Sequence, residues 1–394
     1  MENPIVIVSA ARTPMGHYGG YFKEMPAPEL GAAVIKAVVE CAGLQPAEID
    51  EVIMGCVLPA GQGQAPARQA ALKAGLPVST PCTTINKMCG SGMKAIMLAH
   101  DEILAGSYPH IIAGGMENMS RAPYLMMKAR FGYRLGHDRI YDHMMLDGLE
   151  DAYDKGKAMG VFAEKCVDKY QFTREALDKF AIESLLRAKK ANENGSFAPE
   201  IVPITITHQR ETLTVDHDEN AMKANPEKIP QLKPVFKADG AVTAANSSSI
   251  SDGAAAVTLM RLSEAKRLNI QPLAKIIGHF TYAEDPSWFT TAPIGAIRGL
   301  LKKISWKKEA VDLFEINEAF AAVTMAAMKE IGLAHNKVNI HGGACALGHP
   351  IGASGARILV TLLYALQKNN LQRGIASLCI GGGEATAIAI ERGF

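Results

Sequence analysis

Residues 89–115 read CGSGMKAIMLAHDEILAGSYPHIIAGG, and the predicted fold depends on the alternation within this stretch. Its first part, over 89–106, has the spacing of a helix with a strong apolar face. The apolar run over 111–113 predicts a short buried strand that leads into the glycine pair at 114–115. We therefore expect a helix and a strand packed together, with a glycine turn at the end of the strand.

The same alternation extends to both sides of this stretch. Predicted strands cover 5–10, 51–57, 254–260, 273–277, 313–316, 376–380 and 386–390, and predicted helices cover 28–41, 64–74, 293–302, 318–328 and 357–367. Strands that alternate with helices indicate an α/β fold with a largely parallel central sheet.

A weak internal repeat links the two ends of the chain. In the first half, the turn at 90–92 opens a helix that leads to a strand and to Gly114-Gly115. In the second half, the turn at 352–355 opens a helix that leads to a strand and to Gly381-Gly382-Gly383. Two related halves would bring these turns face to face, and an active site at their junction is the natural expectation.

The segment 121–245 interrupts the pattern. It is rich in Met, Lys, Asp and Pro and contains one clear amphipathic helix over 173–192, with Thr173 as the N-cap and Gly195 just beyond its end. We interpret it as a long excursion from the sheet with its own small fold. It serves either as a cover for a ligand or as a packing insertion, and the pattern favours neither.

Composition narrows the class of protein. The chain has 394 residues, of which 48% are hydrophobic and 21% charged, as in an ordinary globular protein of about two or three domains or two similar halves. Its net charge of +1 argues against nucleic-acid binding by bulk electrostatics. No run of eighteen apolar residues predicts a membrane span, and the N-terminus lacks the basic region of a signal peptide.

The cysteines are odd in number and widely spaced. Seven occur, and no two form a CxxC pair, so neither a disulfide framework nor a structural zinc site is expected. This usage predicts a reducing, cytoplasmic location.

Several known motifs are absent. No complete GxGxxG, no GK[ST] phosphate loop and no GxSxG elbow occurs. The group His137, Asp138, Asp142, His143 and Asp147 matches no metal-binding spacing, and we interpret it as part of a solvated loop. No metal site is expected.

Three segments carry candidate chemistry. Cys89 stands between glycines at a predicted helix N-terminus, where backbone N–H groups and the helix dipole would favour a thiolate; a buried structural cysteine is the alternative. His349, in a glycine-rich loop with His341, could act as a general base or have no role. Cys379 ends an apolar strand before three glycines whose amides could donate to an oxyanion, although a core cysteine is the simpler interpretation.

A fourth segment, 315–321, lies where a predicted strand meets a helix. Asn317 could cap that helix or could orient a water or a carbonyl.

Six segments together resemble the thiolase family, in the order that the family has them. They are Ser9-Ala10-Ala11-Arg12-Thr13-Pro14, the Cys89 segment, Gly114-Gly115-Met116-Glu117-Asn118-Met119-Ser120, Asn317-Glu318-Ala319-Phe320, Gly348-His349-Pro350 and the Cys379 segment. The resemblance spans essentially the whole chain. It implies a five-layer αβαβα fold with two similar halves, 1–120 plus 246–271 and 272–394, and an inserted loop domain over 121–245. It also implies a homotetramer or, less often, a dimer.

The resemblance implies ping-pong acyl transfer. His349 would activate Cys89, which becomes S-acylated, and Cys379 would carry the proton of the second half-reaction. Asn317 would hold a water at the enolate oxygen, and the N–H groups of Cys89 and Gly381 would bind the tetrahedral oxyanion. Two acetyl-CoA would give acetoacetyl-CoA and CoA, or the reverse by thiolysis, with no cofactor because coenzyme A is a substrate.

The resemblance also implies substrate or coenzyme A contacts for Ser248, Met159, Ala319 and Phe320. Two stretches depart from the family: 158–160 is Ala-Met-Gly where His-Met-Gly is frequent, and 246–253 has serines at 249 and 251 in place of Gly and Asn. The departures leave a 3-ketoacyl-CoA thiolase of broader chain length as the alternative. A decarboxylating ketoacyl synthase or a non-catalytic binding protein would not be expected to have Cys89, His349 and Cys379 together.

Overall fold

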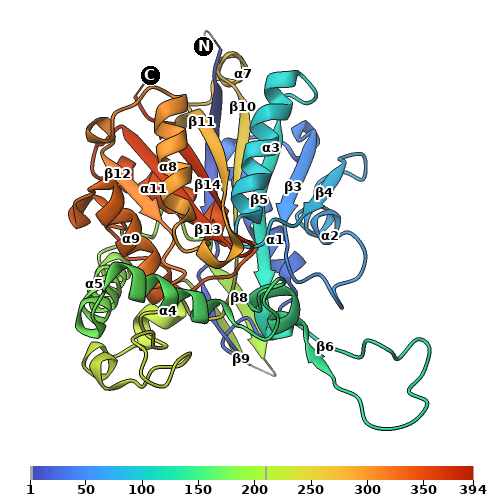
Figure 1. Ribbon diagram of the computed structural model, residues 1–394. Helices are drawn as coiled ribbons and strands as arrows, with labels where there is room; N and C mark the ends of the chain where they lie inside the picture. The colour runs from blue at the N-terminus through green and yellow to red at the C-terminus, as the bar shows by residue number, and fades with distance from the viewer. Residues whose placement is uncertain (1–2, 209–210, 394) are drawn as a thin grey trace.

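A ten-stranded mixed sheet runs through the computed structural model, which describes residues 3–208 and 211–393 (Figure 1). Its order is β12-β13-β14-β11-β1-β10-β5-β3-β4, with β2 paired to β10. The strands are β1 (Ile5–Arg12), β2 (Gly16–His17), β3 (Glu51–Gly55), β4 (Cys82–Ile85), β5 (Ile111–Asn118), β10 (Ser251–Arg261), β11 (Ala274–Ala283), β12 (Leu313–Ile316), β13 (Arg373–Ile380) and β14 (Glu384–Glu391).

The expectation of a largely parallel sheet is wrong. Only β3–β4, β3–β5 and β12–β13 are parallel pairs among the described strands, and the other pairs are antiparallel. The reason is connectivity, because β10 returns from the long excursion and pairs antiparallel with both β1 and β5. In addition, β13 and β14 form a hairpin through the glycines after Ile380.

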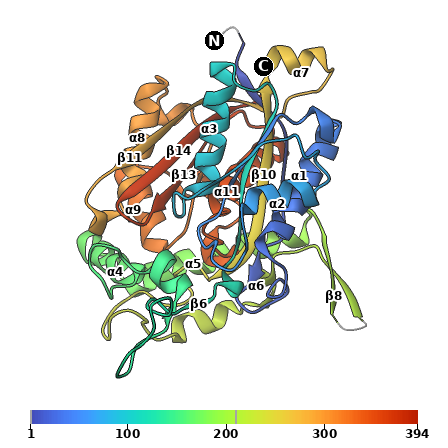
Figure 2. The same ribbon diagram turned by 90° about the vertical axis from the view of Figure 1, so that its right-hand side faces the viewer.

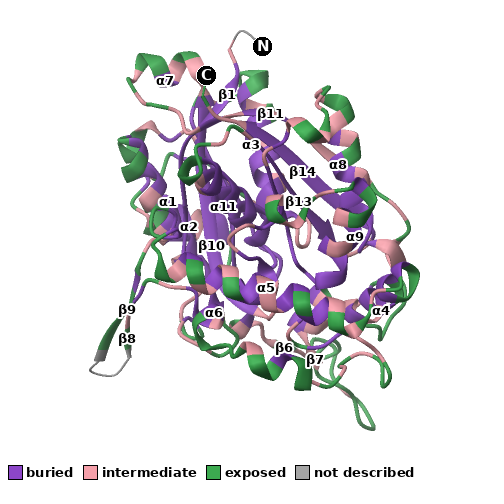
Figure 3. Cartoon of the chain, turned by 90° about the vertical axis from the view of Figure 1, so that its left-hand side faces the viewer, coloured by how far each residue is buried: buried purple, intermediate pink, exposed green. Residues whose placement is uncertain are grey.

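The two parts of the sheet alternate with three layers of helices, which gives the five layers that the resemblance implies. α1 (Ala27–Ala42) and α2 (Pro66–Lys73) cover the outer face of β1, β10, β5, β3 and β4, while α8 (Ala292–Lys303) and α9 (Ala321–Ile331) cover the outer face of β11–β14. α3 (Ser91–Ala105) and α11 (Ser354–Lys368) lie between the two parts of the sheet, which are joined by a short β1–β11 pairing. Figure 3 shows α11 buried at the centre of the molecule, whereas the last turns of α3 are partly exposed.

The two glycine turns of the internal repeat meet, as predicted. A Cβ on Gly92 would lie 2.9 Å from the backbone nitrogen of Ala356, and a Cβ on Gly355 would lie 2.8 Å from Cβ of Met93. Glycine at these positions therefore lets the first turns of α3 and α11 approach each other closely.

Gly114 and Gly115 do not form the predicted turn, because β5 continues through them to Asn118. A Cβ on Gly115 would lie 2.9 Å from the carbonyl carbon of Gly352, so this glycine admits the second-half turn. Likewise, the helix expected over 318–328 begins only at Ala321, and Asn317 does not cap it because Phe320 occupies the N-cap position.

The excursion over 121–245 contains two sizeable helices. The predicted helix over 173–192 is confirmed as α5 (Arg174–Glu193), with the Thr173 hydroxyl accepting the Ala176 N–H at 3.2 Å. A second helix, α4 (Met159–Tyr170), was not predicted. The shorter elements are β6 (Tyr124–Leu125), β7 (Tyr141–Asp142), a π-helical turn (Met145–Leu149), β8 (Ile204–His208), β9 (Glu211–Val215), α6 (Glu219–Lys223) and a 3-10 helix (Pro226–Gln231).

Two parts of the excursion project from the body: the loop between β6 and β7 in Figure 1, and the β8–β9 hairpin in Figure 2. The solvated-loop interpretation of 137–147 holds for His137 but is wrong for His143, which is buried with Nδ1 2.6 Å from the Asp147 carboxylate. No helix in the described part of the chain combines the length and the apolar content that crossing a bilayer requires.

Candidate active site

Cys89 lies in the turn between β4 and α3. The helix begins at Ser91, two residues later than predicted, and Met88 has φ +47°, a strained conformation for a residue with a side chain. The Ser91 hydroxyl closes the turn by accepting the Lys87 N–H at 2.8 Å and donating to the Met88 carbonyl at 2.7 Å. This local bonding holds Cys89 at a sharp corner ahead of the helix.

A cavity of about 380 Å³ opens beside Cys89. His349, Cys379 and Gly381 line it together with Cys89, so side chains from both halves of the sequence meet there. The predicted substrate-binding residues also line it, namely Ser248, Met159, Ala319 and Phe320. The remaining walls are mostly apolar and include Met119, Met145, Leu149, Phe236, Phe289 and Ile351.

Hydrogen bonding fixes the tautomer of His349. Its Nδ1 lies 2.5 Å from the Ser354 hydroxyl, and that hydroxyl donates to the Pro350 carbonyl at 2.9 Å. Nδ1 therefore carries the proton and donates to Ser354, which leaves Nε2 as the basic nitrogen. Nε2 is buried and has no hydrogen-bonding partner among the described residues, so it is available to a thiol or a substrate.

Burial makes His349 a neutral base. It lowers the pKa of the imidazole to about 3, and the nearby Arg357 guanidinium acts in the same direction. Asn317 is fully buried, with its side-chain nitrogen 3.5 Å from Nδ1 of His349. His341, the other histidine of the loop, lines a separate hollow beside α5 and is not part of this site.

The prediction of a favoured Cys89 thiolate is wrong for the folded chain without a bound ligand. Burial raises the pKa of the Cys89 thiol to about 11, although hydrogen bonds from the backbone N–H groups of Gly381 and Cys89 act in the opposite direction. The site therefore holds a neutral thiol beside a neutral imidazole. Deprotonation of Cys89 has to accompany its attack on a substrate, which requires a general base within reach.

Cys379 occupies the predicted position near the C-terminal end of β13. Burial, and next the neighbouring Cys89, raise the pKa of its thiol well above the usual value. Gly382 and Gly383 follow with φ of +93° and +87°, which lets the chain turn tightly into β14. The turn leaves the Gly381 N–H directed at the Cys89 sulfur, a donor that an oxyanion formed there would also use.

Sequence reasoning missed Ser354 and the supporting role of Glu117. The Glu117 carboxylate, fully buried in β5, accepts N–H groups from Val57 at 2.9 Å, Leu58 at 3.1 Å and Gly352 at 2.9 Å. It thereby ties the His349 loop of the second half to the first half. Burial raises its pKa to about 7. The signal in the sequence was the place of Glu117 in the segment Gly114–Ser120, one of the six segments that carry the resemblance.

Much of the apolar wall of the cavity belongs to the excursion over 121–245. Met159 stands at the start of α4, with its sulfur 3.4 Å from a Cβ placed on Gly381, and Phe236 contacts Phe320 edge to face at 6.1 Å between ring centroids. The Ser248 N–H donates to the Ala319 carbonyl at 2.9 Å. Such an arrangement of two thiols, a base and backbone donors around an apolar cavity suits covalent acyl transfer.

Comparison of the sequence with known families gives two matches. Residues 5–263 match the family described as thiolase, N-terminal domain, and residues 270–392 match thiolase, C-terminal domain. A relative from Staphylococcus aureus, described as a probable acetyl-CoA acyltransferase, is 48% identical over 390 residues, which cover 98% of this chain and 99% of the relative.

Two solved structures share the fold. The acetyl-CoA acetyltransferase of Bacillus anthracis has a TM-score of 0.96 and 42% identity, over 99% of this chain and 98% of its own. The Acat5 thiolase of Ascaris suum, solved in complex with coenzyme A, has a TM-score of 0.94 and 40% identity, over 99% and 100% of the two chains. With both halves matched, the chain belongs to the thiolase family and is an acyltransferase of that family.

Proposed function

We propose that the protein is an acetyl-CoA C-acetyltransferase that condenses two acetyl-CoA to acetoacetyl-CoA and CoA, or runs the reverse thiolysis. One observation carries the proposal: Cys89, His349 and Cys379, from separate parts of the chain, line one cavity. The printed descriptions of the Bacillus anthracis and Staphylococcus aureus relatives, and the coenzyme A complex of the Ascaris suum thiolase, support acetyl-CoA and CoA as substrates.

In the first half-reaction, Nε2 of His349 takes the Cys89 proton as the sulfur attacks the acetyl thioester carbon. The N–H groups of Cys89 and Gly381 stabilise the oxyanion, and the carbon–sulfur bond to CoA then breaks. The departing CoA thiolate takes its proton from Cys379. This leaves S-acetyl-Cys89, a Cys379 thiolate and a protonated His349.

In the second half-reaction, the Cys379 thiolate removes a methyl proton from a second acetyl-CoA, and protonated His349 stabilises the enolate oxygen. The carbanion attacks S-acetyl-Cys89, and the released Cys89 thiolate recovers its proton from His349, so every group returns to its starting state. We assign Asn317 to the enolate side, where its buried Oδ1, without a partner among the described residues, suits binding of a water.

The second candidate is a 3-ketoacyl-CoA thiolase that accepts longer acyl chains. The apolar side chains of Leu149, Phe236 and Ile351 in the cavity wall favour it, because they offer contacts to methylene groups beyond the acetyl carbon.

The test is incubation with acetoacetyl-CoA and CoA, following loss of the 3-ketoacyl thioester. We expect turnover, and mass spectrometry should find one added acetyl group on the Cys89 peptide. Absence of both would refute the proposed function. A series of 3-ketoacyl-CoA substrates then separates the candidates: kcat/KM that falls steeply beyond four carbons supports the first, and a flat profile supports the second.

The assembly and domain division implied by the resemblance stay proposals. A homotetramer is supported by the projecting loop between β6 and β7, which exposes Met126, Phe131 and Leu135. We also propose that 121–245 acts as a cover over the substrate, since Met159 and Phe236 of that segment line the cavity. A cytoplasmic location remains a prediction from the cysteine usage.

A further inference from the structure

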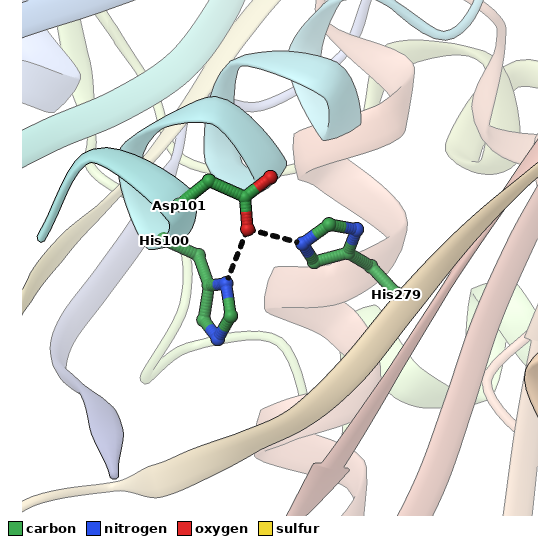
Figure 4. A group of neighbouring side chains, drawn as sticks. All are labelled: His100, Asp101 and His279. Carbon is green, nitrogen blue, oxygen red and sulfur yellow. Dashed lines mark hydrogen bonds and ion pairs between the residues drawn. The ribbon is translucent and has the colours of Figure 1, made fainter. Parts of the chain in front are cut away.

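Two histidines and an aspartate meet at the end of α3 farthest from Cys89. His100 and Asp101 come from the last turns of α3, and His279 comes from β11 (Figure 4). One oxygen of the Asp101 carboxylate lies 3.0 Å from Nδ1 of His100 and 2.9 Å from Nε2 of His279. This group is separate from the catalytic cavity, and nothing in the proposed reaction uses it.

We infer that His100, Asp101 and His279 form a binding site for a divalent transition-metal ion of the Zn²⁺ type. The three ligand atoms all lie within 4.8 Å of one another. A tetrahedral ion with ligands at about 2.0 Å has ligand-to-ligand edges of roughly 3.3 Å. Two of the three edges already have nearly that length, so only the His100–His279 side has to adjust.

The donor set selects the class of ion. Two imidazole nitrogens and one carboxylate oxygen suit Zn²⁺, Co²⁺ or Fe²⁺ better than Mg²⁺ or Ca²⁺, which prefer oxygen ligands. His100 is buried, with 4% of its surface exposed, while half of the Asp101 side chain is open to solvent. Water can therefore reach the open side of the site and complete the coordination.

The ring nitrogens that would bind the ion now face the Asp101 carboxylate, so each neutral ring has to move its proton to its other nitrogen when the ion enters. The Lys303 ammonium donates to the His279 carbonyl at 3.0 Å, and its charge limits the affinity of the site for a cation.

An ion at this site would connect the two halves of the fold. α3 packs on the first-half strands, whereas β11 pairs with β14 of the second half. Asp101 lies about 15 Å from Ser91, the first residue of α3, along the helix axis at roughly 1.5 Å per residue, and Cys89 lies beyond that end of the helix. The ion would therefore stabilise the folded chain without taking part in catalysis.

The experiment is a Zn²⁺ titration of the full-length protein after treatment with EDTA, with the C89A variant titrated in parallel to separate any binding at Cys89. We expect one equivalent of Zn²⁺ to bind by calorimetry, and Co²⁺ to give a visible absorption band. At a hundredfold excess over Kd, Zn²⁺ should raise the unfolding temperature by about 3 °C.

The variants H279N and D101N should abolish binding and the temperature shift. Asp101 is exposed, so D101N tests the site even if H279N folds poorly. H217N is the matched control, because exposed His217 lies 2.9 Å from adjacent Asp216 without a third ligand, and it should bind Zn²⁺ like the unmodified sequence. Absence of stoichiometric binding, or binding retained in both D101N and H279N, would overturn the inference.

Discussion

The N-termini of α3 and α11 are alike in construction and different in chemistry. Each follows a glycine-containing turn, each lies in the middle layer, and Gly92 and Gly355 bring their first turns into contact. Yet a thiol, Cys89, precedes one helix, and an imidazole, His349, precedes the other. The repeated geometry positions the two groups, while a difference in side chain makes one the nucleophile and the other the base.

Burial acts on the two groups in opposite directions. It raises the Cys89 pKa to about 11 and lowers the His349 pKa to about 3, because both charged forms lose hydration. We therefore expect no thiolate–imidazolium pair before the substrate arrives. Because the nucleophile lies in the first half and the base in the second, we expect deprotonation of Cys89 to depend on contact between the halves.

The largest expected effect is the loss of kcat when Cys89 or Cys379 is replaced by alanine. C89A should lower kcat by about 10⁴-fold or more, since no acyl-enzyme can form, and should accept no acetyl label from acetyl-CoA. C379A should lose turnover to a similar extent yet still acquire label on Cys89, because water can protonate the departing CoA thiolate whereas no other group removes the methyl proton in the second half-reaction. Intact-protein mass spectrometry and initial rates measure both.

C41A serves as the control, because Cys41 is an exposed free cysteine outside the cavity, and its activity should be unchanged. Acetyl label on C89A would contradict the assignment of the nucleophile.

The next largest effect on kcat should come from Ser354, whose hydroxyl sets the tautomer of His349. S354A removes the acceptor of the Nδ1 proton, so that part of the His349 population carries its proton on Nε2 and is no longer a base. We expect kcat to fall by roughly 10²-fold with little change in KM.

S354T keeps a hydroxyl and should restore most of the rate. An unchanged kcat in S354A would show that the hydroxyl does not control the base.

A smaller effect should come from the contact between the first turns of α3 and α11, which Gly92 and Gly355 allow. G355A would place a Cβ 2.8 Å from Cβ of Met93, and G92A would place one 2.9 Å from the Ala356 nitrogen. Each should lower the free energy of unfolding by about 1–3 kcal/mol, because α3 and α11 must separate. Urea denaturation measures the change.

The double variant G92A/G355A is the control for this prediction. A single separation of the helices relieves both clashes, so the combined loss should be smaller than the sum of the two. If the losses of unfolding free energy were fully additive, the two glycines would serve unrelated contacts.

The effect that is smallest near neutral pH is a dependence of stability on pH that comes from His349. Its pKa is about 3 in the folded protein, against an ordinary histidine pKa of 6.5 in an unfolded chain. The unfolded state therefore binds a proton that the folded state does not, and stability falls as pH falls from about 6.5 to about 3. H349N should show a shallower fall over that window, measured by urea denaturation at several pH values.

H341N is the comparison for this measurement. Burial lowers the His341 pKa to about 4, so its contribution should level off at a higher pH than that of His349. Identical profiles for H349N and the unmodified sequence would contradict a buried, neutral His349.

The sequence was sufficient to predict the residues whose local setting is distinctive. Cys89, His349 and Cys379 each lie beside glycines at the end of a strand or the start of a helix, and this pattern can be recognised without knowing the fold. All three line the cavity. The boundaries of α5, with its Thr173 cap, were predictable for the same reason.

What the sequence could not predict depends on partners far along the chain. Glu117 has its role because Gly352 and Val57 present N–H groups to it, and no local pattern indicates those partners. The antiparallel insertion of β10 is invisible to hydrophobic periodicity, which reports whether a segment is a strand but not its neighbours. The raised pKa of Cys89 also reflects burial, which outweighs the local helix terminus.

The position of β10 has a consequence for synthesis on the ribosome. β10 lies between β1 and β5, yet the chain reaches Ser251 only after the whole excursion that follows Asn118 has been made. At about 5–20 residues per second, translation of that interval takes on the order of ten seconds. During this delay β1 and β5 present unpaired apolar strand edges, which makes the emerging chain a candidate client for chaperones until β10 arrives.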